Sequence, residues 1–261
     1  MSRRKRTTVE TVHETKRHKV RFGHSSGSVE LFLVAKRAAD YLAKDIAVSE
    51  KGIRDENLIA IVFSVLAVEG FLNDLSTLDG SRDEQPSIVD CDDRLKSLQR
   101  VLTIAEEANL HSLDKLKLAH EILGKPIDFG RQPVQDYQLL KQLRDAIVHP
   151  KPSSTTMVTE VTSPPSPPKF LQSKDKLIRA LQSRDLLATD PSGLGQGFLY
   201  WLNGRKLAQW AVETASAIVT MTIESLPRGD FRLGVALLLY RDFFLGNETK
   251  LKDIVSNDEE G

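Results

Sequence analysis

Residues 58–72, LIAIVFSVLAVEGFL, are the richest apolar stretch of the chain, and their apolar side chains surround a helix on every side. A helix that is apolar all round belongs in the middle of a bundle. The stretch is short for a membrane span, and it carries the charged residue Glu69. We therefore expect a buried central helix at about 56–78 and no association with a membrane.

The surrounding sequence predicts further helices that pack against this one. Apolar residues recur every three or four positions after Ser28, which we expect to cap a helix that ends before Gly52. A third helix is expected at about 88–108. Ser112 is expected to cap a fourth helix, which Gly124 closes. The buried face of this fourth helix is expected to comprise Leu113, Leu116, Ala119, Ile122 and Leu123.

The second half of the chain is less regular. Residues 150–168 contain six prolines and eight Ser or Thr residues, which predicts an insertion loop whose run TTMVTEVT offers a small hairpin. Helices are expected at about 177–187 and 200–226. The predicted fold is all-α, with a flexible basic arm at 1–27, a helical bundle at 28–226, and a C-terminal helix and acidic tail at 227–261.

The charge of the chain is balanced in total but polarised along its length. Lys plus Arg and Asp plus Glu number 36 each, which argues against a wholly basic nucleic-acid binder. Residues 1–24 nevertheless hold eight cations and two acidic residues, a net charge of +6, so the remainder carries −6. This arm can contact RNA phosphates, although such a run is also typical of a solvated tail. Its candidate RNA-binding residues are Arg3, Arg4, Lys5 and Arg6.

Cysteine usage indicates the compartment. Cys91 is the only cysteine of the sequence, which excludes an internal disulfide and a zinc site built from cysteines. A reducing environment fits this composition, so we expect a cytoplasmic protein. The basic start is followed by polar residues, which does not resemble a secretion signal.

The segment LRDAIVHPKP, residues 143–152, contains the most unusual pair of side chains. Leu139, Leu143 and Ile147 recur at helical spacing in a fifth helix, so Arg144 falls at the edge of the buried stripe. Packing does not require an arginine there. A salt bridge at the core boundary and a functional guanidinium both explain it.

His149 is expected to lie just past the last turn of that helix. Pro150 disfavours helical geometry in the residue before it, so the helix should end at about Val148. The unpaired carbonyls and the negative end of the helix dipole favour a protonated imidazole. A permanent cation beside an acid or base suits phosphate chemistry, whereas a surface histidine at a helix end is the simpler interpretation.

Glu69 is the second anomaly, because helical spacing places it on an apolar face with Asn73 one turn later. A carboxylate in such a place must pair or be protonated, since an unpaired buried charge costs several kcal/mol. We predict that Glu69 pairs with Arg144. The pair either ties two helices together or takes part in chemistry, and both interpretations can hold together.

Other candidate motifs favour structural explanations. His120 falls on the apolar stripe of the fourth helix, where a hydrogen-bonded core histidine is expected. The glycines at 193–197 follow no strand, so a turn is favoured over a phosphate loop. The histidines of the arm, His13, His18 and His24, lack metal-site spacing. We expect neither a metal site nor a cofactor.

Three motifs, FSVLAVEGFLNDL, SLDKLKLAHEILG and LRDAIVHPKP, occur in the order and spacing seen in the HEPN superfamily, which residues 28–226 resemble. On that resemblance Arg144 and His149 match the catalytic pair, and Glu69 with Asn73 match a supporting polar pair. Asp145 replaces the commoner asparagine. The resemblance implies an all-α homodimer, often a metal-independent ribonuclease with a toxin or defence role and a cognate inhibitor or partner protein.

The resulting hypothesis is a cytoplasmic endoribonuclease in which His149 is the general acid or base, Arg144 stabilises charge on the phosphate, and Glu69 orients Arg144. The first alternative is a noncatalytic HEPN-like module that binds RNA, a nucleotide or a protein. The second is a helical scaffold whose basic arm docks on nucleic acid. A ribonuclease should expose Arg144 and His149 in one cleft, whereas a scaffold should bury or separate them.

Overall fold

The computed structural model describes most of the chain from Gly27 onward. The described residues are 27–44, 49–77, 93–149, 155–158, 169–172, 175–187, 199, 202–229, 232, 234–236, 240–244 and 248–259. The candidate RNA-binding residues Arg3, Arg4, Lys5 and Arg6 lie outside these ranges, as do the arm histidines and the glycines at 193–197.

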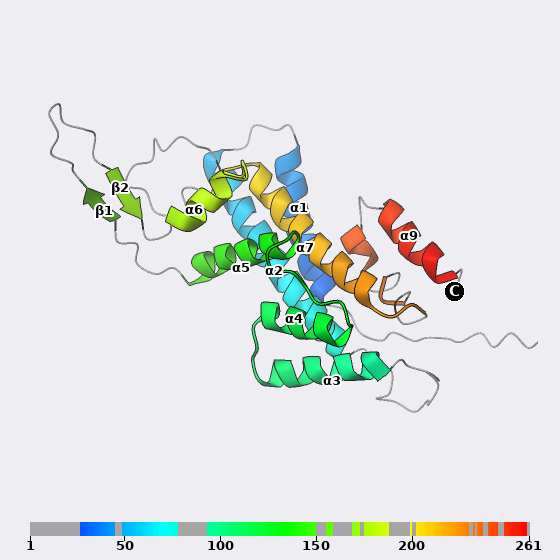
Figure 1. The fold of residues 1–261 in the computed structure, drawn as a ribbon. Helices are drawn as coiled ribbons and strands as arrows, with labels where there is room; N and C mark the ends of the chain where they lie inside the picture. The colour runs from blue at the N-terminus through cyan, green and yellow to red at the C-terminus, as the bar shows by residue number, and fades with distance from the viewer. Residues whose placement is uncertain are drawn as a thin grey trace, which may run out of the picture.

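The fold is a helical bundle with α2 at its centre (Figure 1), as the sequence predicts. Helix α2 contacts α1 and α7 most extensively and also packs against α3, α4 and α5. The bundle helices are α1 (Gly27–Ala43), α2 (Glu50–Thr77), α3 (Asp93–Glu107), α4 (Ser112–Ile122), α5 (Val134–Val148), α6 (Asp175–Gln182) and α7 (Lys206–Ser225).

Helix α2 is buried on several sides but not around its whole circumference, since Ile59 is 37% exposed and Leu58 and Phe63 are only partly buried. Its fully buried side chains include Ile61, Val65, Phe71, Leu72 and Leu75. Among the described helices, the stretch Lys51–Thr77 is long and apolar enough to cross a membrane by length and composition. Half of the most apolar part of that stretch is buried inside the bundle.

The start of α1 differs from the prediction. Ser28 does not cap the helix, because α1 already begins at Gly27 and the Ser28 side chain is buried within the first turn. Its hydroxyl donates to Asp74 Oδ2 on α2 at 2.6 Å. Gly70 allows this close approach, since a Cβ there would lie 3.0 Å from the Ser28 Cβ. Ser28 therefore serves helix packing instead of capping.

The first helix ends before Gly52, as predicted, but the second helix begins earlier than the predicted position of about 56. Helix α1 ends at Ala43 and α2 begins at Glu50, so Gly52 lies inside α2. The predicted helix at 88–108 is described as α3, from Asp93, and its first expected turn lies outside the described residues.

Helix α4 closes as predicted, but it does not begin as predicted. Gly124 has a φ of +70°, its N–H donates to the Glu121 carbonyl at 3.1 Å, and the Lys125 N–H donates to the His120 carbonyl at 3.0 Å. This is the Schellman pattern, which favours glycine. The N-cap is His111, and Ser112 is the first helical residue. Of the expected buried face, Leu116, Ala119 and Leu123 are buried, whereas Leu113 and Ile122 are partly buried.

Helix α7 begins later than the sequence predicts. Asn57 on α2 donates from Nδ2 to the carbonyls of Leu202 and Gly204, at 2.9 and 3.1 Å, and holds this segment outside a helix. Gly204 is required there, because a Cβ would come within 1.9 Å of the Leu186 carbonyl oxygen. The helix expected at 177–187 is shorter, with α6 ending at Gln182.

The described residues include one antiparallel hairpin, of β1 (Thr155–Val158) and β2 (Lys169–Gln172), paired from Thr155 with Gln172 to Val158 with Lys169. Strand β1 lies in the run TTMVTEVT, where a hairpin was predicted, but its partner β2 follows the predicted loop at 150–168 instead of lying in that run. The C-terminal region, predicted as a helix and an acidic tail, contains the 3₁₀ helix η3 (Arg241–Phe244) and then the helix α9 (Glu248–Glu259), which includes acidic residues assigned to the tail. Buried Tyr240, Phe243 and Ile254 join this region to the main core.

Candidate functional site

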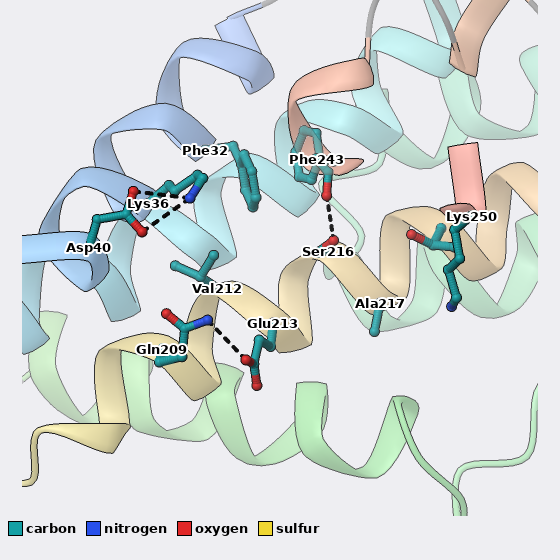
Figure 2. Close-up of a pocket in the computed structure, with 11 residues that line it drawn as sticks. Phe32, Lys36, Asp40, Gln209, Val212, Glu213, Ser216, Ala217, Phe243 and Lys250 are labelled. Atoms are coloured by element: carbon teal, nitrogen blue, oxygen red, sulfur yellow. Dashed lines mark hydrogen bonds and ion pairs between the residues drawn. The ribbon is translucent and has the colours of Figure 1, made fainter. Parts of the chain in front are cut away.

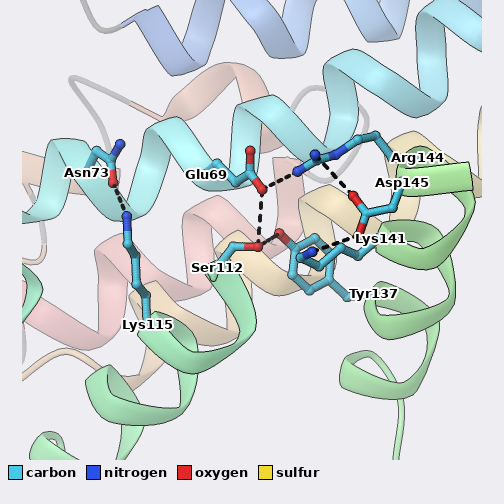
Figure 3. A network of polar contacts seen from close by, with 8 residues as sticks. All are labelled: Glu69, Asn73, Ser112, Lys115, Tyr137, Lys141, Arg144 and Asp145. Atoms are coloured by element: carbon cyan, nitrogen blue, oxygen red, sulfur yellow. Dashed lines mark hydrogen bonds and ion pairs between the residues drawn. The ribbon is translucent and has the colours of Figure 1, made fainter. Parts of the chain in front are cut away.

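Arg144 lies near the end of α5, beside the residues that bury this helix. Tyr137, Leu140 and Leu143 are fully buried, and the Arg144 side chain is 16% exposed. It therefore lies at the core boundary, where helical spacing placed it. Its guanidinium forms an ion pair with Glu69 through Nη2, and its Nη1 is 3.1 Å from Asp145 Oδ1 (Figure 3). The predicted pairing of Glu69 with Arg144 is present.

Glu69 links three helices at this point. Its side chain is 29% exposed, and its Oε1 accepts from Arg144 on α5 and, at 3.4 Å, from the Ser112 hydroxyl on α4. Tyr137 donates from its hydroxyl to Ser112 Oγ at 3.1 Å. Burial raises the pKa of Tyr137 well above its usual range, so the phenol stays a neutral donor. The carboxylate of Glu69 is thus held from two sides.

Asp145 bridges two cations of its own helix. Its Oδ1 faces Arg144, and its Oδ2 is 3.0 Å from Lys141 Nζ. The Lys141 side chain is 12% exposed and the Asp145 side chain is 41% exposed. Both carboxylates near the guanidinium are therefore engaged by more than one donor.

Asn73 lies one turn beyond Glu69 but binds a different partner. Its Oδ1 accepts from Lys115 Nζ on α4 at 3.1 Å, and Lys115 also forms an ion pair with Glu106 on α3. Burial lowers the pKa of Lys115, while the negative charge of Glu69 acts in the opposite direction. Asn73 therefore anchors the α3–α4 pair to α2 and does not join the Arg144 contacts directly.

His149 lies just past the last turn of α5, as the following Pro150 predicts. Helix α5 ends at Val148, and His149 is the C-cap, with its backbone N–H donating to the Asp145 carbonyl at 3.0 Å. The residue is exposed, in contrast to Arg144. The ribonuclease hypothesis required both side chains to be exposed in one cleft, whereas a single chain exposes only the histidine and leaves the guanidinium mostly buried.

The sequence missed four residues of this network: Ser112, Lys115, Tyr137 and Lys141. Ser112 was predicted to cap α4, whereas Tyr137 was assigned no role and the lysines carried no signal beyond ordinary helix charges. The spacing of Lys141 and Asp145 is the usual one for a helical ion pair and could have identified that contact.

His120 is a core histidine, as predicted. It is 1% exposed, with Nδ1 3.1 Å from the Lys125 carbonyl and Nε2 3.3 Å from Thr222 Oγ1 on α7. Burial lowers its pKa, more than the hydrogen bond to the carbonyl raises it. Among the described residues, no group of three His, Cys, Asp or Glu side chains is arranged to hold a metal ion.

A separate cavity of about 220 Å³ lies between α1 and α7 (Figure 2). Phe32 and Phe243 stack in its wall at 4.0 Å between ring centroids, and the Lys36–Asp40 ion pair lies at its edge. None of the site residues predicted from the sequence lines it.

The chain matches no family model, no curated protein and no solved structure. The HEPN superfamily therefore stays an expectation from the sequence motifs.

Proposed function

We propose that this protein is a metal-independent endoribonuclease of the HEPN type. The observation that carries the proposal is the Glu69–Arg144 ion pair, which fixes a guanidinium near the end of α5, next to the exposed His149. In an ideal helix residues 144 and 149 are separated by a rise of about 7.5 Å and by about 140° around the axis, so both side chains would have to turn toward the helix end to reach one phosphodiester.

In the proposed reaction the 2′-hydroxyl of the substrate attacks the adjacent phosphorus, and the bond from phosphorus to the 5′-oxygen breaks. His149 removes the proton from the 2′-hydroxyl or supplies one to the leaving 5′-oxygen. Arg144 stabilises the negative charge that develops on the phosphoryl oxygens. Glu69 orients the guanidinium. Each terminal nitrogen carries two N–H groups, so a carboxylate on each leaves a donor for the phosphate.

The proposed active form is a cytoplasmic homodimer. Val148 next to His149 is 45% exposed, so this apolar side chain lies where a second copy could cover it if the two copies meet at the end of α5. The basic arm, with Arg3, Arg4, Lys5 and Arg6, would add contacts to RNA phosphates. A toxin or defence role, with a cognate inhibitor or partner protein, belongs to the same proposal.

A noncatalytic HEPN-like binding module is the second candidate. The observation that favours it is the burial of Arg144, whose guanidinium faces two carboxylates. A phosphate would have to reach a guanidinium that is 16% exposed and already faces the negative charges of Glu69 and Asp145. In this case the ion pair ties α5 to α2, and RNA, a nucleotide or a protein binds without being cleaved.

Incubation of the purified protein with RNA in the presence of a chelator separates the two functions. The ribonuclease should cut RNA, leave DNA of the same sequence intact, and produce 2′,3′-cyclic phosphate ends. Protein that binds RNA and leaves it whole, with or without added metal ions, supports the noncatalytic module.

A further inference from the structure

The carboxylate of Asp145 lies between two cations, and Lys141 is the one to which the sequence assigned no role. Lys141 Nζ is 3.0 Å from Oδ2, and Arg144 Nη1 is 3.1 Å from Oδ1 (Figure 3). Residues 141, 145 and 149 are spaced by four, so the helix carries Lys141 and Asp145 along one strip that leads to His149. Lys141 therefore belongs to the surroundings of the proposed site.

The charges around Arg144 show why a second cation matters there. Arg144 faces Glu69 from α2 and Asp145 from its own helix, so one positive charge stands against two negative charges. Such a group repels a phosphate. On α4, Lys115 is attracted to Glu69 but also pairs with Glu106 of α3. Lys141 pairs with Asp145 and offsets the second carboxylate.

We propose that Lys141 is a positioning residue of the RNA site, which offsets the charge of Asp145 so that Arg144 remains able to bind a phosphate. This inference rests on the proposed function. The Lys141 side chain is 12% exposed, so water screens its attraction to Asp145 less than it screens a surface pair. Neighbouring residues of the strip are about 6 Å apart along the helix axis. This is less than the screening length of about 8 Å at physiological salt, so their charges still act on one another.

A double-mutant cycle tests this proposal with Lys141→Met, Asp145→Asn and the double variant. The measurements, at low ionic strength, are the kinetics of RNA cleavage and the Kd for a fluorescent 2′-O-methyl oligonucleotide, which lacks the nucleophile. Lys141→Met should raise Kd and KM about three- to tenfold, with a smaller change in kcat. The double variant should have a Kd and a KM close to those of wild type, because it lacks both the carboxylate of Asp145 and the positive charge that offsets it.

Two further variants separate charge from structure. Lys141→Arg should keep wild-type binding, since it keeps the positive charge. The Lys36–Asp40 pair on α1 is a matched control with the same residue types and spacing, a 3.0 Å contact, and side chains 26% and 52% exposed. Lys36→Met should leave cleavage and Kd unchanged. If Lys141→Met does not fold, Lys141→Gln takes its place in the cycle.

The outcomes distinguish this inference from the function on which it rests. A wild-type protein that neither binds nor cleaves RNA overturns the proposed function, and the role of Lys141 with it. If the wild type is active but the double variant has the same raised Kd and KM as Lys141→Met, the role of Lys141 is overturned and the proposed function stands.

Discussion

Arg144 on α5 and Glu69 on α2 form an ion pair between residues 75 positions apart in the sequence. Glu69 also accepts from Ser112 on α4, so this one carboxylate connects three helices. His149 follows α5 directly, and the position of the histidine therefore depends on the contacts that hold the end of this helix.

Removal of the Glu69 charge should destabilise the fold. Breaking a fully buried pair costs roughly 3–5 kcal/mol and an exposed pair below about 1 kcal/mol. Glu69 and Arg144 lie between these limits, at 29% and 16% exposure. We expect Glu69→Gln to lower the free energy of unfolding, measured in urea, by about 1–3 kcal/mol. Glu121→Gln, which alters a 3.8 Å surface pair with Lys117, is the control and should change it little. Equal urea midpoints of unfolding for both variants would show that the ion pair contributes nothing to the stability of the fold.

Replacement of His149 should abolish RNA cleavage and leave the fold intact. The His149 side chain is exposed, and the hydrogen bond at the end of α5 comes from the backbone N–H, which alanine also has. His149→Ala should therefore keep the circular dichroism of the wild type. One positioned acid or base contributes about 10²- to 10⁴-fold to a rate. His111, exposed at the N-cap of α4, provides the matched control, and His111→Ala should remain active. Persistent cleavage by His149→Ala would rule out the proposed mechanism.

The protein should sediment as a homodimer at micromolar concentration. The exposed Val148 beside His149 provides an apolar contact that a second copy can bury. Val148→Asp should shift the protein toward the monomer of 29.2 kDa and reduce cleavage in parallel. A wild type that sediments only as a monomer and still cleaves RNA would exclude a shared active site.

Acid should destabilise the protein through His120. Burial holds the pKa of His120 below its usual value of about 6.5. Below pH 6.5 His120 binds a proton in the unfolded chain but not in the folded protein. The free energy of unfolding is therefore highest above this pH, and it falls as the pH drops toward the pKa of the folded state. His120→Gln should therefore lose less stability than wild type between pH 7.5 and pH 5, measured in urea. His111→Gln is the control and should follow the wild type. Identical pH dependence of wild type and His120→Gln would contradict this role.

The sequence by itself determined the helices and their buried faces. An apolar stretch that surrounds a helix predicted the central position of α2, and Gly124 and Pro150 predicted where α4 and α5 end. These features are local, because periodicity and backbone preference act over a few consecutive residues. The Glu69–Arg144 pair was predictable for a related reason, since a carboxylate on an apolar face requires a cation.

Apart from the Glu69–Arg144 pair, only the tertiary structure decided which partners the polar side chains take. Ser28 and Ser112 both suggested caps, yet one binds Asp74 and the other links Tyr137 to Glu69, since packing brings those groups closer than the helix ends. The Asn57 contacts that delay the start of α7 and the pairing of β1 with β2 likewise join segments distant in the sequence. Such contacts depend on how completed helices pack, and local pattern carries no information about that geometry.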